Sequence, residues 1–234
     1  MGEDALALVR SDNATASLAR NEPGAADDPC FLSRLGQALC DDERFAEARE
    51  WYERLAKIPP HDVDGELGLA WVAQGLGDPA DCWRRCEAVL QRGLTLSIDD
   101  LEFVAYASDE AKQFTRTLGL LDELLRREPE RENILNWKGY VLLRMRRDAE
   151  AEAVFRRCID EERDGRHPLW NLAVVLRRRG AFEEAIGVLR RIVKKDGELY
   201  AGAAKEIAKV ERMRAKGLAQ GDEDPGGEGG FSLT

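Results

Sequence analysis

Large apolar and small residues recur along the chain in one arrangement, at intervals of 34 or 35 residues. Small residues occupy the same place in five copies: Gly36, Ala70, Ala105, Gly139 and Ala173. A second compact residue follows each of them twelve positions later: Ala48, Cys82, Thr117, Ala151 and Ala185. The large apolar residues around them lie three or four positions apart, which is the spacing of one helix face. The pattern predicts ten helices in five hairpins, followed by one more helix. Such hairpins must stack, because one repeat cannot bury its apolar face alone.

Proline, glycine and capping residues divide these helices from one another. Pro59-Pro60 stops the second helix of the first copy, because proline has no N–H for a helical hydrogen bond. Asp78-Pro79 is typical of a helix start, with an N-cap followed by proline in the first turn. Gly180 suits a left-handed turn between two helices. The repeats are therefore expected to begin near residues 29, 63, 98, 132 and 166.

The two ends of the chain differ from the repeats in composition. Residues 1–28 contain six acidic and two basic residues and few large apolar ones. Residues 218–234 are acidic and rich in glycine. Both segments are predicted to be disordered, since neither could bury enough apolar surface to fold. The repeat array is expected to span residues 29–217.

The last helix, at about residues 198–217, is predicted to cap the array. Its apolar face would direct Leu199, Ala203 and Val210 towards the neighbouring hairpin. Glu206 would lie on the opposite, polar face, which a terminal repeat needs to stay in solution.

This arrangement resembles the tetratricopeptide repeat, a helix–turn–helix unit of 34 residues. The first copy matches that pattern at Leu32, Leu35, Gly36, Leu39, Phe45, Ala48, Tyr52, Leu55 and Pro60. The fifth matches at Leu169, Leu172, Ala173, Leu176, Gly180, Phe182, Ala185, Leu189 and Ile192. Glu66 and Lys138 depart from it, because each stands where a large apolar residue is usual. The resemblance implies an all-α fold: a right-handed α-solenoid of five helix–turn–helix repeats with a C-terminal capping helix.

In this family the first helix of each hairpin lines a concave groove that binds the partner. The resemblance places nine candidate residues on that surface: Trp71, Tyr106, Asn136, Tyr140, Trp170, Asn171, Val174, Arg177 and Arg178. Aromatic rings and arginine dominate the binding energy of many interfaces. The surface would be acidic in its N-terminal half and basic in its C-terminal half, so that acidic residues of a peptide would approach Arg177 and Arg178. In the alternative interpretation, the rings pack between neighbouring helices and only fill space.

Some relatives bind the acidic C-terminus of heat-shock chaperones through a clamp of lysine, arginine and asparagine side chains. Asn136, Asn171 and Lys205 match part of that set, but the first lysine of the clamp has no counterpart. The resemblance therefore does not predict a chaperone-tail adaptor.

The function that the resemblance implies is a noncatalytic protein-interaction module: a scaffold, adaptor or chaperone-like protein that binds a peptide or a partner protein. The alternative is an RNA-binding helical repeat that uses the basic C-terminal half, with Tyr140 and Trp170 stacking on bases. The net charge of −10 disfavours a nucleic-acid partner, because phosphates repel an acidic chain. The oligomeric state stays open.

Catalytic and metal-binding patterns are weak in this sequence. Cys82 and Cys86 lie four apart on one helix, but both occupy packing positions, where buried cysteine acts as a small apolar residue. The two histidines, His61 and His167, stand in no ligand spacing. We therefore expect no enzyme activity, no metal and no cofactor. With no apolar run long enough to span a bilayer and no paired cysteine motif, the expected location is cytoplasmic.

Overall fold

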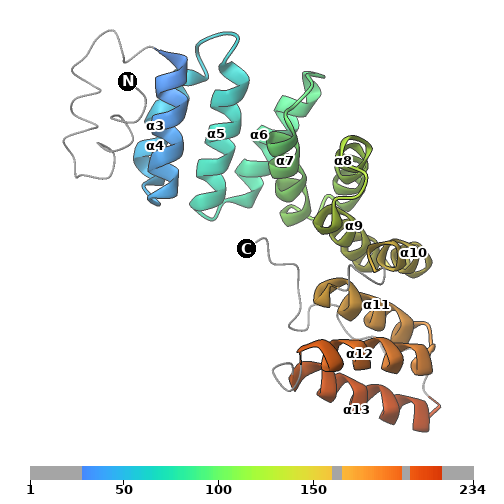
Figure 1. Ribbon diagram of the computed structural model, residues 1–234. Helices are drawn as coiled ribbons and strands as arrows, with labels where there is room; N and C mark the ends of the chain where they lie inside the picture. The colour runs from blue at the N-terminus through green and yellow to red at the C-terminus, as the bar shows by residue number, and fades with distance from the viewer. Residues whose placement is uncertain (1–27, 160–164, 197–200, 218–234) are drawn as a thin grey trace. The chain divides into compact units, whose positions relative to one another are not determined.

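The computed structural model describes residues 28–159, 165–196 and 201–217, which fall into two compact units, residues 1–113 and 114–234. Within the described residues all regular structure is α-helical (Figure 1). The first unit contains α3 (Pro29–Asp41), α4 (Phe45–Leu55), α5 (Asp62–Gly75), α6 (Pro79–Gln91) and α7 (Ile98–Glu110). The second contains α8 (Phe114–Arg127), α9 (Glu132–Arg144), α10 (Asp148–Cys158), α11 (Arg166–Arg178), α12 (Phe182–Asp196) and α13 (Ala201–Ala215). The prediction of an all-α helical repeat is thus confirmed.

Each first helix ends in the same type of turn. One residue with positive φ lies in each turn: Glu43, Gly77, Lys112, Arg146 and Gly180. The N–H of the next residue donates to the carbonyl five positions back, as from Arg44 to Leu39 at 2.8 Å and from Ala181 to Leu176 at 2.9 Å. These are the features of a Schellman turn, which reverses the chain after a helix. Three of the five positions hold non-glycine residues, so glycine in the sequence would have located only two turns.

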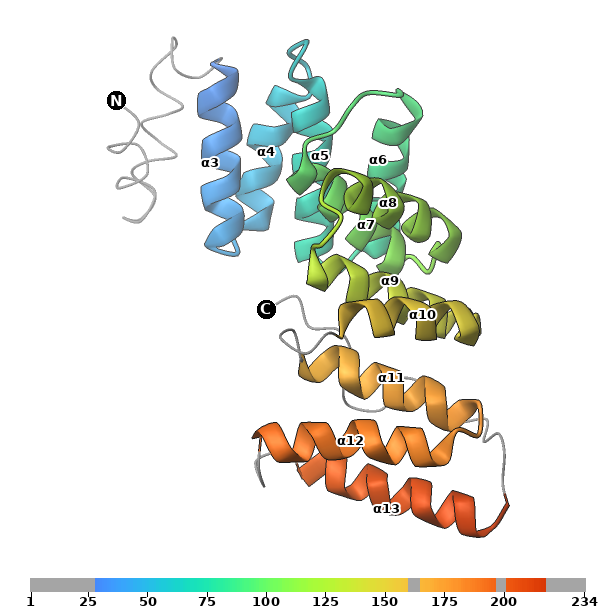
Figure 2. The same ribbon diagram turned by 45° about the vertical axis from the view of Figure 1, so that its right-hand side comes forward.

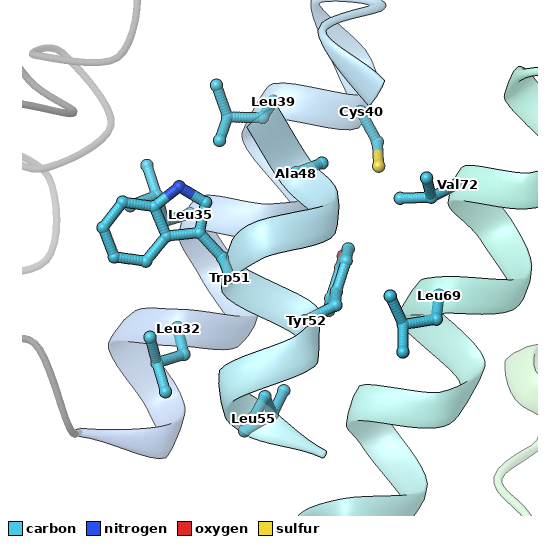
Figure 3. Close-up of a cluster of buried hydrophobic side chains, with 10 residues drawn as sticks. All are labelled: Leu32, Leu35, Leu39, Cys40, Ala48, Trp51, Tyr52, Leu55, Leu69 and Val72. Carbon is cyan, nitrogen blue, oxygen red and sulfur yellow. The ribbon is translucent and has the colours of Figure 1, made fainter. Parts of the chain in front are cut away.

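The core of the first unit is organised around Tyr52 (Figure 3). Its ring projects from α4 towards Leu69 and Val72 of α5, while Trp51 points to the other side of α4. A Cβ added at Gly36 of α3 would lie 2.7 Å from this ring, and one added at Gly68 of α5 would lie 2.1 Å from it. The three atoms nearest to a Cβ added at Gly36 all belong to the ring of Tyr52, which lies one turn after Ala48 on α4. Two glycines therefore make room for one aromatic ring, which joins consecutive hairpins.

The second unit repeats this contact three hairpins further along the chain. A Cβ added at Gly139 of α9 would meet the ring of Phe155 on α10 at 2.5 Å. Gly139 and Phe155 are spaced as Gly36 and Tyr52 are, and Phe155 and Trp137 are fully buried. The helices of these hairpins approach closely because glycine faces an aromatic ring at the same repeat position.

The two departures from the repeat pattern each form an ion pair with a neighbouring helix. Glu66 of α5 pairs with Arg85 of α6, with 2.9 Å between Oε2 and Nη1. Lys138 of α9 pairs with Asp122 of α8, with 2.5 Å between Nζ and Oδ1. An ion pair with the adjacent helix thus replaces the apolar contact that the repeat usually has at this position.

The last described helix, α13, packs against α12, as the turned view in Figure 2 shows. Ala203 and Val210 are fully buried, as expected of its apolar face, whereas Leu199 lies outside the described residues. Glu206 is not on an outer surface: its Oε1 lies 3.0 Å from Nε of Arg177 on α11. The expected disordered ends also lie outside the described residues, apart from Asp28, which caps α3. None of the described helices combines the length and apolar character needed to span a bilayer.

Candidate partner-binding surfaces

Three aromatic side chains of the first unit lie on the neighbouring helices α5 and α7, one of them exposed and the other two half-buried. Trp71 of α5 is 42% exposed, and its ring centroid lies 5.0 Å from that of Phe103 on α7, with 38° between the planes. One turn further along both helices, Nε2 of Gln74 donates to the hydroxyl of Tyr106 over 3.5 Å. We call Trp71, Phe103 and Tyr106 the aromatic surface of the first unit.

The packing of the hairpins does not account for this surface. On α5 the residues that hold the core are Leu67, Ala70, Val72 and Ala73, all of them buried. Trp71 stands between these residues in sequence, but its side chain points away from the core. Large aromatic side chains are usually buried to a greater extent than this indole ring. Phe103 is not one of the nine candidate residues named from the sequence. Its spacing of three residues from Tyr106 is the signal that could have identified it.

Acidic residues are frequent on the two helices that carry the aromatic surface. Helices α5 and α7 contain no lysine or arginine and eight acidic residues: Asp62, Asp64, Glu66, Asp99, Asp100, Glu102, Asp109 and Glu110. The pKa of Tyr106 is raised by partial burial of its hydroxyl and next by the nearby charge of Glu110, with a smaller contribution from Asp109. Asp99 and Glu110 are exposed to solvent. The formally charged residues of the helices that carry the rings are therefore all negative.

The aromatic candidates of the second unit are half-buried, as Phe103 and Tyr106 are, so neither is as exposed as Trp71. Tyr140 of α9 and Trp170 and Val174 of α11 are half-buried. The guanidinium of Arg144 lies 4.4 Å from the ring centroid of Phe114 and 5.8 Å from that of Tyr140. This cation–π contact already occupies one face of the Tyr140 ring.

The two arginines proposed to attract an acidic peptide are buried instead. Arg178 is 5% exposed: its Nη2 lies 2.9 Å from Oδ1 of Asp148, and its Nη1 donates to the carbonyl of Leu143 at 3.2 Å. Arg177 is 6% exposed and pairs with Glu206. Burial lowers the pKa of Arg178, and Asp148 opposes that shift by favouring the charged form. Both side chains thus connect neighbouring helices, and their charges are compensated within the chain.

The two asparagine candidates also bind each other. Nδ2 of Asn171 on α11 donates to Oδ1 of Asn136 on α9 at 3.1 Å, and both side chains are buried. This bond connects two successive first helices, which supports the position of α11 against α9. Trp71 is therefore the most exposed of the nine candidates, whereas the asparagines and arginines lie between helices.

The cysteines are placed as packing residues. Cys82 and Cys86 are fully buried, Cys40 and Cys158 are nearly so, and Cys30 is exposed. Burial raises the pKa of the Cys40 thiol to about 12. The pKa of the Cys86 thiol is also raised, mainly by its hydrogen bond with Cys82 and to a smaller extent by burial. In the part of the chain that the structure describes, no three His, Cys, Asp or Glu side chains gather as metal ligands would.

These environments predict the thiol reactivity of the native protein. The exposed Cys30 thiol should react with a chromogenic disulfide in the native protein. The four buried thiols should react only after denaturation, because the reagent cannot reach them in the folded chain. Counting released thiolate with and without guanidinium measures this. Fast reaction of a second thiol in the native protein would contradict the buried positions.

Helical hairpins, a repeated turn and a repeated glycine–aromatic contact define this chain as an all-α helical-repeat protein. A model described as "Tetratricopeptide repeat" matches residues 3–63 and 109–166, which is just over half of the chain, and a second model of the same description matches residues 170–199. The chain therefore belongs to the tetratricopeptide repeat family.

Solved structures with the same fold include three that span most of this chain. YrrB, described as a tetratricopeptide repeat protein with an unusual peptide-binding site, has a TM-score of 0.67 and 14% identity over 82% of this chain and 97% of its own. A tetratricopeptide repeat protein from Parabacteroides merdae ATCC 43184 has a TM-score of 0.68 and 18% identity over 80% of this chain and 74% of its own. A MamA structure has a TM-score of 0.60 and 20% identity over 78% of this chain and 97% of its own. At such identities the similarity supports the fold alone. A comparison with curated proteins gave no match.

Proposed function

We propose that this chain is a noncatalytic protein-interaction module, a scaffold or adaptor that binds a peptide or a segment of a partner protein. The module comprises the repeats from residue 29 to 217, acts in the cytoplasm and needs no cofactor. The observation that carries the proposal is the exposed Trp71 of α5, whose ring is in contact with that of Phe103 on α7. Exposed aromatic patches of this kind mark interaction sites, and a few aromatic residues supply most of the binding energy at such sites.

The fold neighbours support the same proposal by analogy. The description of YrrB names a peptide-binding site on a tetratricopeptide repeat protein. Because this fold hosts many functions, that analogy gives only the kind of partner. The proposed location of the binding site comes from the aromatic surface of the first unit.

The RNA-binding alternative has less support. Many arginines of the second unit are paired with carboxylates, as Arg147 is with Glu150 and Arg157 with Glu130. Charges paired in this way release fewer counterions on binding phosphate, which weakens the main source of affinity for nucleic acid. We therefore place the interaction site on the first unit.

The substitution Trp71→Ala tests the proposal. A displayed library of random peptides is selected against the full chain, and the affinities of the enriched peptides, made synthetically, are measured by fluorescence anisotropy. We expect Trp71→Ala to weaken binding by at least about tenfold, since loss of a dominant aromatic residue costs about 2 kcal/mol.

Leu94→Ala is the matched control. Leu94 is 52% exposed, more than Trp71, and lies outside the helices that carry the aromatic surface, so its removal should leave the affinity unchanged. Both variants should melt at the temperature of the parent protein. Equal affinities of the parent and Trp71→Ala proteins, or selection of no peptide at all, would contradict the proposed function.

A further inference from the structure

We propose that the aromatic surface of the first unit binds a cationic peptide segment, in which arginine or lysine side chains alternate with apolar ones. This inference rests on the proposed function and adds the chemistry of the partner. It differs from the expectation drawn from the family groove, in which an acidic peptide would approach Arg177 and Arg178.

The register of α5 and α7 defines the shape of the surface. Trp71 contacts Phe103, and Gln74 binds Tyr106; the two pairs have the same separation of 32 residues along the chain. The two helices therefore run in the same direction at this point, with successive turns side by side. The exposed ring of Trp71 and the half-buried rings of Phe103 and Tyr106 thus form a strip along the helix axes.

Negative charge lies at both ends of this strip. On α7 the order along one face is Asp99, Phe103, Tyr106 and Glu110, at spacings of four, three and four residues. One carboxylate thus precedes the rings by a turn, and another follows them by a turn. Both are exposed, and neither makes an ion pair among the described residues. These two charges are available to a partner.

A cationic segment complements each part of this surface. A guanidinium or ammonium group is attracted by the face of an indole ring, and most strongly by that of tryptophan. The same group pairs with a carboxylate at the end of the strip, while apolar side chains cover Phe103 and the exposed part of Trp71. An acidic segment would bring like charges together with Asp99 and Glu110, which disfavours it as a partner.

The test uses the displayed random library selected against the full chain. We expect the enriched peptides to contain more arginine and lysine than the starting library. Their synthetic versions should lose about threefold to tenfold in affinity when Asp99→Asn and Glu110→Gln are combined, because each exposed charge pair contributes modestly. The affinity should also fall as salt rises, since mobile ions screen such pairs.

The control removes the same charge from elsewhere on the first unit. Glu53→Gln on α4 and Glu87→Gln on α6 change the net charge equally, but both lie on second helices, away from the aromatic surface. Their combination should leave the affinity unchanged, and melting curves of all variants check the fold. If the peptides bound only through general attraction to an acidic protein, both double variants would lose affinity equally. That result would overturn the inference.

The outcomes separate this inference from the proposed function. Neutral or acidic peptides that depend on Trp71 but not on Asp99 and Glu110 would overturn the cationic partner and leave the interaction surface in place. Peptides whose affinity is unchanged by Trp71→Ala would overturn both the proposed function and the cationic partner.

Discussion

Replacing Gly65 by alanine should lower the free energy of unfolding of the first unit by about 1–3 kcal/mol or more. Gly65 lies in the first turn of α5, where an added Cβ would stand 2.3 Å from the backbone nitrogen of Ala56 and 2.5 Å from its Cα. A side chain could rotate away from such a contact, but backbone atoms cannot. The segment between α4 and α5 would have to move, and the packing of Tyr52 against α5 would be disturbed.

Gly119→Ala is the matched control for this substitution. Gly119 lies within α8, and no atom stands within 4 Å of a Cβ added there. Alanine should therefore raise stability by about 0.5–1 kcal/mol, because glycine loses more conformational entropy in a helix. Urea unfolding followed by circular dichroism measures both variants. A gain at Gly65 equal to that at Gly119 would contradict the close approach of α4 and α5.

Asp148→Asn should destabilise the second unit by about 3 kcal/mol. Asp148 begins α10 and pairs with Arg178, whose side chain is only 4% exposed. Removing the negative charge leaves a buried guanidinium without compensation, and breaking a buried pair on one side typically costs about 3–5 kcal/mol. Asparagine retains an acceptor oxygen, so we expect a loss at the lower end of that range. Urea unfolding again measures the change.

Two further variants separate the buried pair from other effects of Asp148. Glu150→Gln removes a second acid from the first turn of α10, but its partner Arg147 is exposed, so stability should hardly change. Combining Asp148→Asn with Arg178→Met should recover much of the loss, because no buried charge then remains. A double variant as unstable as Asp148→Asn alone would show that Arg178 is not the cause.

Much of the fold could be predicted from the sequence because the hairpins repeat. Gly36 and Ala70 occupy equivalent positions in the first helices of two successive hairpins. A single copy would not have shown which positions are equivalent. The partner of Gly36 was harder to predict, because spacing locates a small residue without identifying which atom of the next helix approaches it. The nearest atoms belong to the ring of Tyr52, one turn after Ala48 on the same helix.

The candidate site was less predictable for a related reason. Repeat position places Arg177 and Arg178 on a lining face, but their burial depends on side chains from other helices. Asp148 and Glu206 supply the opposing carboxylates from 30 residues upstream and 29 downstream. Trp71 was easier to locate, since packing does not require a large aromatic residue at its position. Whether it binds a partner is a prediction that remains to be tested.

The most direct measurement is a crosslinking map of the bound peptide on the full chain. An enriched peptide with a photoreactive diazirine at its central apolar position is irradiated with the protein, and the joined residues are identified by mass spectrometry. The account predicts crosslinks concentrated on α5 and α7, around Trp71, Phe103 and Tyr106. Crosslinks confined to α4 and α6, or to the second unit, would contradict it.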